Sequence, residues 1–100
     1  MVQATTPTFI LTLPNDVDLD EAAHVYFTLK QKNVEIVKED TDLIIDGNEV
    51  SVYLTQAETV KLSVGTALLQ LNWTYTNGAR ACSTIASVEV DENLLKAVVE

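Results

Sequence analysis

The stretch that decides the fold is residues 66–90, TALLQLNWTYTNGARACSTIASVEV. Its first half alternates between apolar and polar residues, and a period of two over this length favours a β-strand over an amphipathic helix. Asn77-Gly78 follows, and this pair favours a type I′ turn because both central residues of that turn need positive φ. The stretch is therefore expected to form a long β-hairpin. The buried face of its first arm should consist of Ala67, Leu69, Leu71, Trp73 and Tyr75.

The second arm of the hairpin, residues 79–90, is less regular. Ile85 and Val88 lie in opposite phases of the alternation. One extra residue in a strand resets the phase, so we expect a β-bulge near Ala86 and Ser87.

Shorter runs with the same period precede the hairpin. The sequence predicts five further strands there, at residues 8–13, 24–31, 34–38, 42–46 and 50–54. The period changes at Thr55, which fits a capping box with Glu58 at the start of one short helix near residues 56–62. About seven strands with turn signals between them predict an all-β fold, an antiparallel immunoglobulin-like β-sandwich. We expect two sets of residues to pack against each other across the core of the sandwich. The first set is Leu69, Leu71 and Trp73, and the second is Val25, Phe27 and Leu29.

The length of 100 residues indicates one domain. Residues 1–7 resemble a flexible N-terminal lead-in that ends at Pro7, and residues 8–90 make up the sandwich. Residues 91–100 form a C-terminal tail with the pattern of a short helix, which Asp91 would cap.

Charge excludes two classes of partner. Acidic residues outnumber basic residues by 15 to 6, so the net charge is −9 at pH 7. Such a surface repels nucleic-acid phosphates and anionic lipids, and we expect neither nucleic acid nor membrane as a partner. No segment approaches the ~18 apolar residues of a spanning helix. The single cysteine excludes an internal disulfide, and residues 1–7 lack the basic and apolar regions of a signal peptide.

Residue types that carry chemistry are few and scattered. His24 alternates with core residues and is expected to be a solvated strand residue, and Cys82 is expected to be a packed thiol. Asp16, Asp18 and Asp20 have the spacing of calcium ligands, but the EF-hand pattern fails at its glycine position, and a solvated acidic loop is the simpler interpretation. We therefore expect no catalytic residue, no cofactor and no metal, and a protein that is not an enzyme.

Surface residues are the remaining candidates for function. Apolar residues that point outward from strands mark a partner site where several are adjacent. The apolar tail must either fold back on the sandwich or contact another chain. An acidic monomer is the default state because like charges repel, and a dimer through an edge strand or the tail is the alternative. The candidate partner contacts are Tyr26, Tyr53, Leu68, Leu94, Leu95 and Val98.

Five segments carry a wider resemblance: TFILTLP at 8–14, VYFTLKQ at 25–31, LTQAET at 54–59, LQLNWTYTNG at 69–78 and NLL at 93–95. Together they resemble the short uncharacterised proteins found among the structural genes of bacteriophages and prophages of Firmicutes. More loosely, the chain is similar to the immunoglobulin-like N-terminal domain of phage baseplate proteins.

This resemblance implies a non-enzymatic structural or adaptor module of a phage or prophage particle, in its tail or baseplate. It implies a protein partner in the particle or self-association, and a location in the virion or the bacterial host cytoplasm. The alternative is a small free-standing domain that binds a protein or a glycan and acts on a bacterial host factor.

Overall fold

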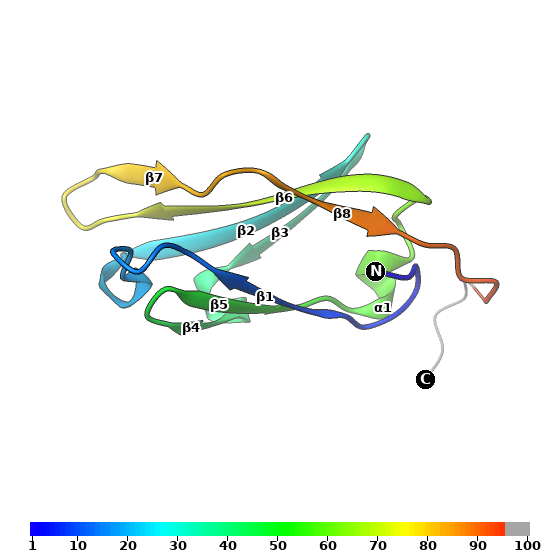
Figure 1. Ribbon diagram of the computed structural model, residues 1–100, viewed down its shortest axis with the longest axis horizontal. Coiled ribbons are helices and arrows are strands. Elements are labelled where there is room, and N and C mark those ends of the chain that lie inside the picture. Colours follow the sequence, from blue (N-terminus) through cyan, green and yellow to red (C-terminus); the bar gives the residue numbers. More distant parts are fainter. Residues whose placement is uncertain (96–100) are drawn as a thin grey trace.

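Two antiparallel sheets pack face to face in the computed structural model, which describes residues 1–95 (Figure 1). The three-stranded sheet has the order β1 (Thr8–Thr12), β5 (Glu49–Tyr53), β4 (Leu43–Asp46). The five-stranded sheet has the order β3 (Val34–Glu39), β2 (His24–Gln31), β6 (Gly65–Thr74), β7 (Arg80–Cys82), and β8 (Ala86–Val90) also pairs with β6. Helical segments are single turns: η1 (Leu19–Glu21), η2 (Asp40–Asp42) and α1 (Gln56–Thr59). The predicted all-β sandwich is confirmed.

The strand order is that of an immunoglobulin-like sandwich. In chain order, β1 to β6 take the places of strands B, C, C′, D, E and F, and β7 with β8 takes the place of strand G. The place of strand A, beside β1, is taken by no strand of residues 1–95. The three-stranded sheet therefore ends at β1.

β6 is the central strand of the larger sheet, and its partners differ from the prediction. Val25, Phe27 and Leu29 of β2 lie beside Trp73, Leu71 and Leu69 in the same sheet, and do not meet them across the core. The reason is that β2 and β6 pair directly, so their inward residues point the same way. The opposite layer of the core comes from the smaller sheet, whose Phe9 stacks on Phe27 with 6.4 Å between ring centroids. Val50 and Val52 of β5 are also fully buried there.

The hairpin tip is a three-residue loop, and the predicted type I′ turn is wrong. The Tyr75 N–H donates to the carbonyl of Ala79 at 2.9 Å, and the Gly78 N–H donates to the carbonyl of Tyr75 at 3.0 Å. Gly78 has a φ of +88°, whereas φ is not positive at Asn77. This is a type I turn followed by a left-handed glycine. The Asn77 side chain instead accepts a hydrogen bond from the Ala79 N–H at 2.9 Å.

The return arm contains the extra residue that the phase change predicted, but at another position. Asn72 faces Cys82, whereas Leu69 faces Ala86, so three steps along β6 are matched by four along the return arm. The break lies at residues 83–85 and not at Ala86 and Ser87, which are paired in β8.

The capping box is confirmed, although α1 is shorter than residues 56–62. The Thr55 N–H donates to Glu58 Oε1 at 2.9 Å, and the Glu58 N–H donates to Thr55 Oγ1 at 3.2 Å. Lys38 Nζ of β3 lies 2.8 Å from Glu58 Oε1, so one carboxylate both caps the helix and ties it to the edge of the larger sheet. Thr59 is buried and donates to the carbonyl of Thr5 at 2.7 Å.

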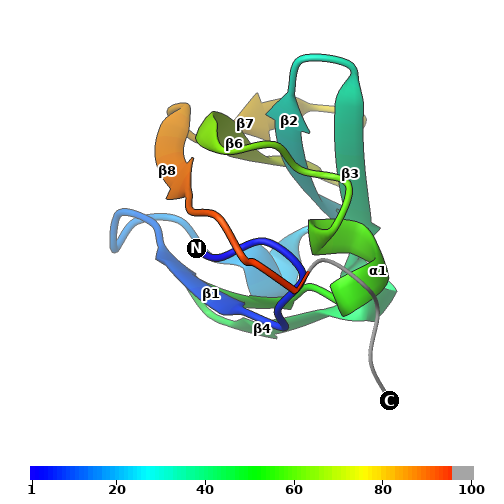
Figure 2. The same cartoon turned by 90° about the vertical axis from the view of Figure 1, so that its right-hand side faces the viewer.

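The N-terminal segment is not a flexible lead-in. Gln3 and Ala4 are buried, and Val2 forms a parallel bridge with Asp91. The Gln3 N–H donates to the Asp91 carbonyl at 3.0 Å, and the Gln3 side chain donates to the carbonyl of Leu62. Figure 2 shows this segment running between β8 and α1. The prediction of a flexible lead-in over residues 1–7 is therefore wrong for its first part, in which Gln3 and Ala4 are buried.

The described part of the tail, residues 91–95, contains no helix, and its Leu95 N–H donates to Asn93 Oδ1 at 3.1 Å. Its backbone is held at Asp91, and Asn93 Nδ2 donates to the carbonyl of Gln3 at 2.9 Å. The predicted helix is therefore wrong for these residues, and the remaining five lie outside the described part of the chain.

We predict that Lys32→Gly stabilises the protein. Lys32 opens the two-residue loop between β2 and β3 with a φ of +51°, where a side chain costs about 1 kcal/mol or more. Part of this gain is offset by the greater freedom of glycine in the unfolded chain, so we expect a net rise of about 0.5 kcal/mol in the free energy of unfolding. Urea titration measures it. Asn33→Gly, where φ is not positive, is the matched control and should destabilise; equal losses in both variants would contradict the prediction.

We predict a pH-dependent contribution from Glu58. Burial raises its pKa, but the hydrogen bonds from Lys38 and Thr55 and the Lys38 charge outweigh burial, so the pKa lies below its ordinary value of 4.5. Unfolding then takes up a proton, and the stabilisation is fully present above pH 4.5 and lost as pH falls through the folded pKa.

Glu58→Gln keeps a side-chain oxygen that can accept from the Thr55 N–H but removes the charge that faces Lys38, so it should lower the free energy of unfolding by about 0.5 kcal/mol at pH 7. Urea titrations across pH should show the difference from wild type shrinking below pH 4.5. Glu49→Gln, at an exposed position of β5, is the control. A difference that stays constant down to acid pH would contradict this account.

Candidate functional site

The outward residues predicted as partner contacts do not form one patch. Tyr26 and Leu68 lie on the outer face of the larger sheet, where Tyr26 faces Asn72 and Leu68 faces Lys30. Along β6, the position beside Tyr26 and Leu68 itself are four residues apart, a distance of about 13 Å in a strand. Tyr53 is half-exposed on the outer face of the other sheet.

The tail candidates are separate again. Leu94 is 95% exposed and Leu95 is 59% exposed, so neither has folded back on the sandwich. Val98 lies outside the described residues. The five predicted contacts that the structure describes therefore do not converge on a site.

The residues that could carry chemistry are also dispersed. His24 is exposed, as predicted, with Nδ1 3.5 Å from Asp40 Oδ1. Cys82 is exposed, so the predicted packed thiol is wrong: its side chain falls on the outer face of the sheet. β6 lies between β2 and β7, which keeps the His24 imidazole and the Cys82 thiol apart.

The acidic loop serves local structure. Asp18 accepts from the Asp20 N–H at 3.0 Å and caps η1, and Asp20 accepts from the Gly47 N–H at 3.1 Å. Within residues 1–95 no three side chains of the metal-binding types come together.

The outermost strand of the smaller sheet is the unusual feature. Among the strands of residues 1–95, β1 pairs with β5 alone. The carbonyl of Pro7 accepts from the Leu54 N–H, and the Leu13 N–H donates to the Asn48 carbonyl, so the odd-numbered residues of this segment bond to β5. By the alternation of an antiparallel ladder, the N–H and C=O groups of Thr8, Ile10 and Thr12 point to the other, open side.

β1 also lacks the features that normally protect an edge strand. Charged side chains, proline and bulges discourage an edge from pairing with another chain. The opposite edge of the sandwich, β3, carries Glu35, Lys38 and Glu39. β1 reads TFILT, without charge, proline or bulge.

An apolar groove runs along this open edge, between β1 and the return arm of the hairpin. Figure 2 shows β1 and β8 on one side of the sandwich, with β3 and α1 on the other. Two adjoining hollows of about 190 Å³ and 300 Å³ make up the groove. None of the residues that line them is charged: Ile10, Leu11, Thr12, Leu13, Pro14, Val17, Leu69, Leu71, Trp73, Cys82, Ser83, Thr84 and Ala86.

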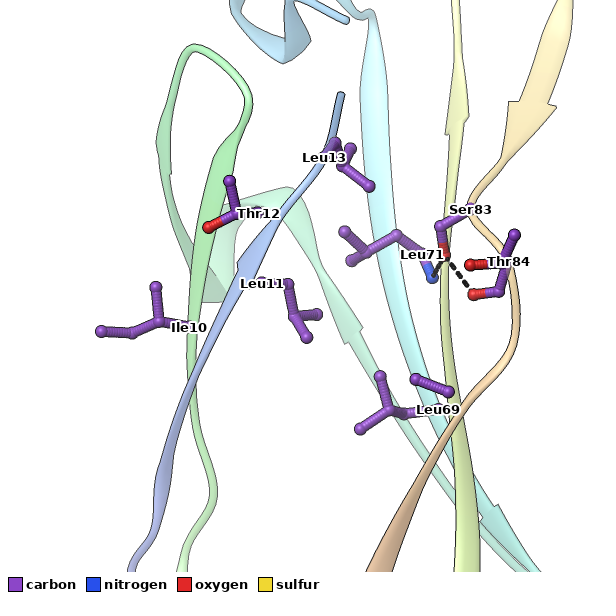
Figure 3. Close-up of a pocket in the computed structure, with 9 residues that line it drawn as sticks. Ile10, Leu11, Thr12, Leu13, Leu69, Leu71, Ser83 and Thr84 are labelled. Atoms are coloured by element: carbon purple, nitrogen blue, oxygen red, sulfur yellow. Dashed lines mark hydrogen bonds between the residues drawn. The ribbon is translucent and has the colours of Figure 1, made fainter. Parts of the chain in front are cut away.

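Side chains from both sheets meet in the groove. Figure 3 shows Leu11 and Leu13 pointing from β1 toward Leu69 and Leu71, while Ile10 points to the other side of β1. Leu11 and Leu13 are only partly buried, although their side chains face inward. Their incomplete burial shows that the sandwich is open on this side.

The far wall of the groove depends on Ser83, at the break between β7 and β8. Its hydroxyl accepts from the Leu71 N–H at 2.9 Å and donates to the Thr84 carbonyl at 3.0 Å, and both bonds appear in Figure 3. Its own N–H donates to the Leu71 carbonyl at 2.9 Å. One side chain thus replaces a ladder bond that the break removes, and this lets the return arm bow away from β6.

A second, polar hollow lies on the outer face of the larger sheet. Tyr26, Asn72, Thr74 and Arg80 line it, and the Arg80 guanidinium donates to Asn72 Oδ1 at 3.1 Å. It combines one aromatic ring with three hydrogen-bonding side chains, so it can offer both a stacking surface and hydrogen bonds to a polar ligand.

Sequence reasoning missed both the groove and the edge. The absence of charge from residues 8–13 could have indicated an unprotected edge, but the pairing of β1 on one side alone is a property of the whole sheet. Tyr26 is the one predicted contact that lines either surface.

The comparisons with known proteins found no relative. No family model matches the chain, and neither the curated proteins nor the solved structures contain a significant match. No helix among residues 1–95 is long and apolar enough to cross a membrane.

We predict that Ser83→Ala opens the break between β7 and β8. The Leu71 N–H would lose its partner, at a cost of about 1–2 kcal/mol in the free energy of unfolding, and its amide hydrogen should exchange with solvent faster. Ser87→Ala, at an exposed position of β8, is the control. Unchanged protection of the Leu71 amide, measured by NMR hydrogen exchange, would contradict the role given to Ser83.

Proposed function

We propose that this protein is a non-enzymatic structural or adaptor module of a phage or prophage particle, in its tail or baseplate. Its means of assembly would be the edge of β1. One observation carries the proposal: an uncharged edge strand, unpaired on one side by residues 1–95, borders an apolar groove. The assignment to a phage particle comes from the resemblance to short phage structural proteins.

The physical basis is strand addition. An extended segment that pairs with a free sheet edge gains main-chain hydrogen bonds, and alternate side chains fill pockets beneath it. On β1, the backbone groups of Thr8, Ile10 and Thr12 point to the open side. The uncharged hollows of the groove lie beside this strand. The groove lining presents no general base, the Ser83 hydroxyl is engaged by the Leu71 N–H and the Thr84 carbonyl, and the Cys82 side chain lies on the outer face of the sheet. These features support binding rather than catalysis.

The alternative is a free-standing domain that binds a protein or glycan of the bacterial host. The polar hollow around Tyr26 and Arg80 is the observation that favours it. Binding to immobilised host glycans that Tyr26→Ala abolishes, with Ile44→Ala as a control on the opposite sheet, would support this alternative.

Mass spectrometry of purified particles tests the proposed function. We expect the chain in particles from an induced lysogen that encodes it, and we expect the edge variant Ile10→Lys to be depleted from them. Ile44→Lys, also exposed on the outer face of the smaller sheet, should be incorporated normally because β4 lies at the other edge of that sheet, with β5 between it and β1. Absence of the wild-type chain, at a depth that detects minor tail proteins, would refute the proposal.

A further inference from the structure

We propose that the segment that pairs with the β1 edge is β1 of a second copy of this chain. The two strands would run antiparallel about a two-fold axis that passes beside Ile10. The inference rests on the proposed function in one respect, since both use the β1 edge for assembly. It does not depend on the chain being part of a phage particle.

The sequence of β1 is symmetric about its centre. It reads Thr8-Phe9-Ile10-Leu11-Thr12, with a threonine at each end, a large apolar residue on each side of the middle, and isoleucine in the middle. A two-fold axis at Ile10 places Thr8 opposite Thr12 of the second copy. It also places Phe9 opposite Leu11, and Ile10 opposite its own copy. Thr–Thr and apolar pairs are favourable cross-strand neighbours.

The hydrogen-bonding phase fits the same axis. The edge-facing backbone groups belong to Thr8, Ile10 and Thr12. Antiparallel pairing about Ile10 sets these residues against one another in three facing pairs, and each such pair exchanges two hydrogen bonds. A register shifted by two residues leaves only two such pairs within the strand. A register shifted by one residue places the edge-facing N–H and C=O groups of one strand opposite residues whose own groups point away, toward β5, so the ladder hydrogen bonds cannot form.

The inward side chains of the added strand would cover the groove. In the two-fold register, Phe9 and Leu11 of the second copy continue the inner face of the three-stranded sheet beyond β1. They would occupy the place of the missing strand A, above the hollow of about 190 Å³ that Leu11, Leu69 and Leu71 line. Each copy provides this cover for the other, as an isologous interface requires.

Charge favours a second copy over a basic partner. The chain carries a net charge of −9, so two copies repel each other over most of their surfaces. β1 and the groove lining are uncharged, so two copies can approach along this edge without a like-charge pair. A partner selected by positive charge would need an acidic edge, which β1 does not offer. On the outer face, Ile10 is 63% exposed and would be covered by its own copy.

Light scattering tests the dimer. We expect a molar mass of twice 11.0 kDa, more dimer at higher salt because screening weakens the repulsion, and monomer for Ile10→Lys, which puts two like charges at the axis. Ile44→Lys has the same chemistry, is 73% exposed on the same face, and should remain dimeric. Circular dichroism should show both variants folded. A wild-type mass of 11.0 kDa at the highest soluble concentration, or equal effects of the two variants, would overturn the inference.

Disulfide trapping tests the register, in a Cys82→Ser background that removes the exposed native thiol. Facing residues of a hydrogen-bonded pair have Cα atoms about 5.5 Å apart, within the range that a disulfide spans. A mixture of Thr8→Cys and Thr12→Cys chains should therefore cross-link under mild oxidation, whereas each variant alone should not. Cross-linking of Thr8→Cys with itself, or the absence of cross-linking in the mixture, would overturn the two-fold register.

The outcomes separate this inference from the proposed function. A monomeric chain that is nevertheless found in particles overturns the dimer alone, and its edge then binds an extended segment of another protein. A dimer that is absent from particles refutes the particle role and leaves the β1 pairing intact.

Discussion

The pairing of β6 on both of its sides is the constraint on which the rest of the sandwich depends. This ten-residue strand joins β2 on one side and β7 and β8 on the other. Its inward residues, including Ala67, Leu71 and Trp73, are nearly all fully buried. A slip of one residue against β2 would turn this whole set to solvent, so burial determines the register. The smaller sheet packs on the apolar face that these inward residues form.

The same strand explains why one side of the sandwich is open. The return arm holds one residue too many for β6, and Ser83 absorbs it by bonding the Leu71 N–H through its side chain. The arm bows outward there, while the smaller sheet ends at β1 without a strand A. Both effects fall on the same side, where they leave partly buried leucines along an unprotected edge. The closed side, by contrast, has Lys38 and Glu58 paired between β3 and α1.

Local features of the fold were predictable, and features that depend on pairing were not. The strand at residues 24–31, the capping box at Thr55 and the extra residue in the return arm all follow from periodicity or from contacts between close neighbours in sequence. The turn type at Asn77, the burial of Gln3 and the exposure of Cys82 were predicted wrongly. Each depends on what lies beside the residue in space. The candidate site was missed for the same reason, since an edge exists only relative to a complete sheet.

The sequence by itself determined the class of fold, the central strand and the direction in which each strand's side chains point, because alternation with a period of two is a local signal. It also determined that β1 is uncharged and symmetric about Ile10. Only the tertiary structure decided that β1 is an edge, that Leu69 and Leu71 line a groove beside it, and that the N-terminal residues close the far end. Those facts depend on which strands become neighbours, and neighbours are chosen by packing of the whole core rather than by any one segment.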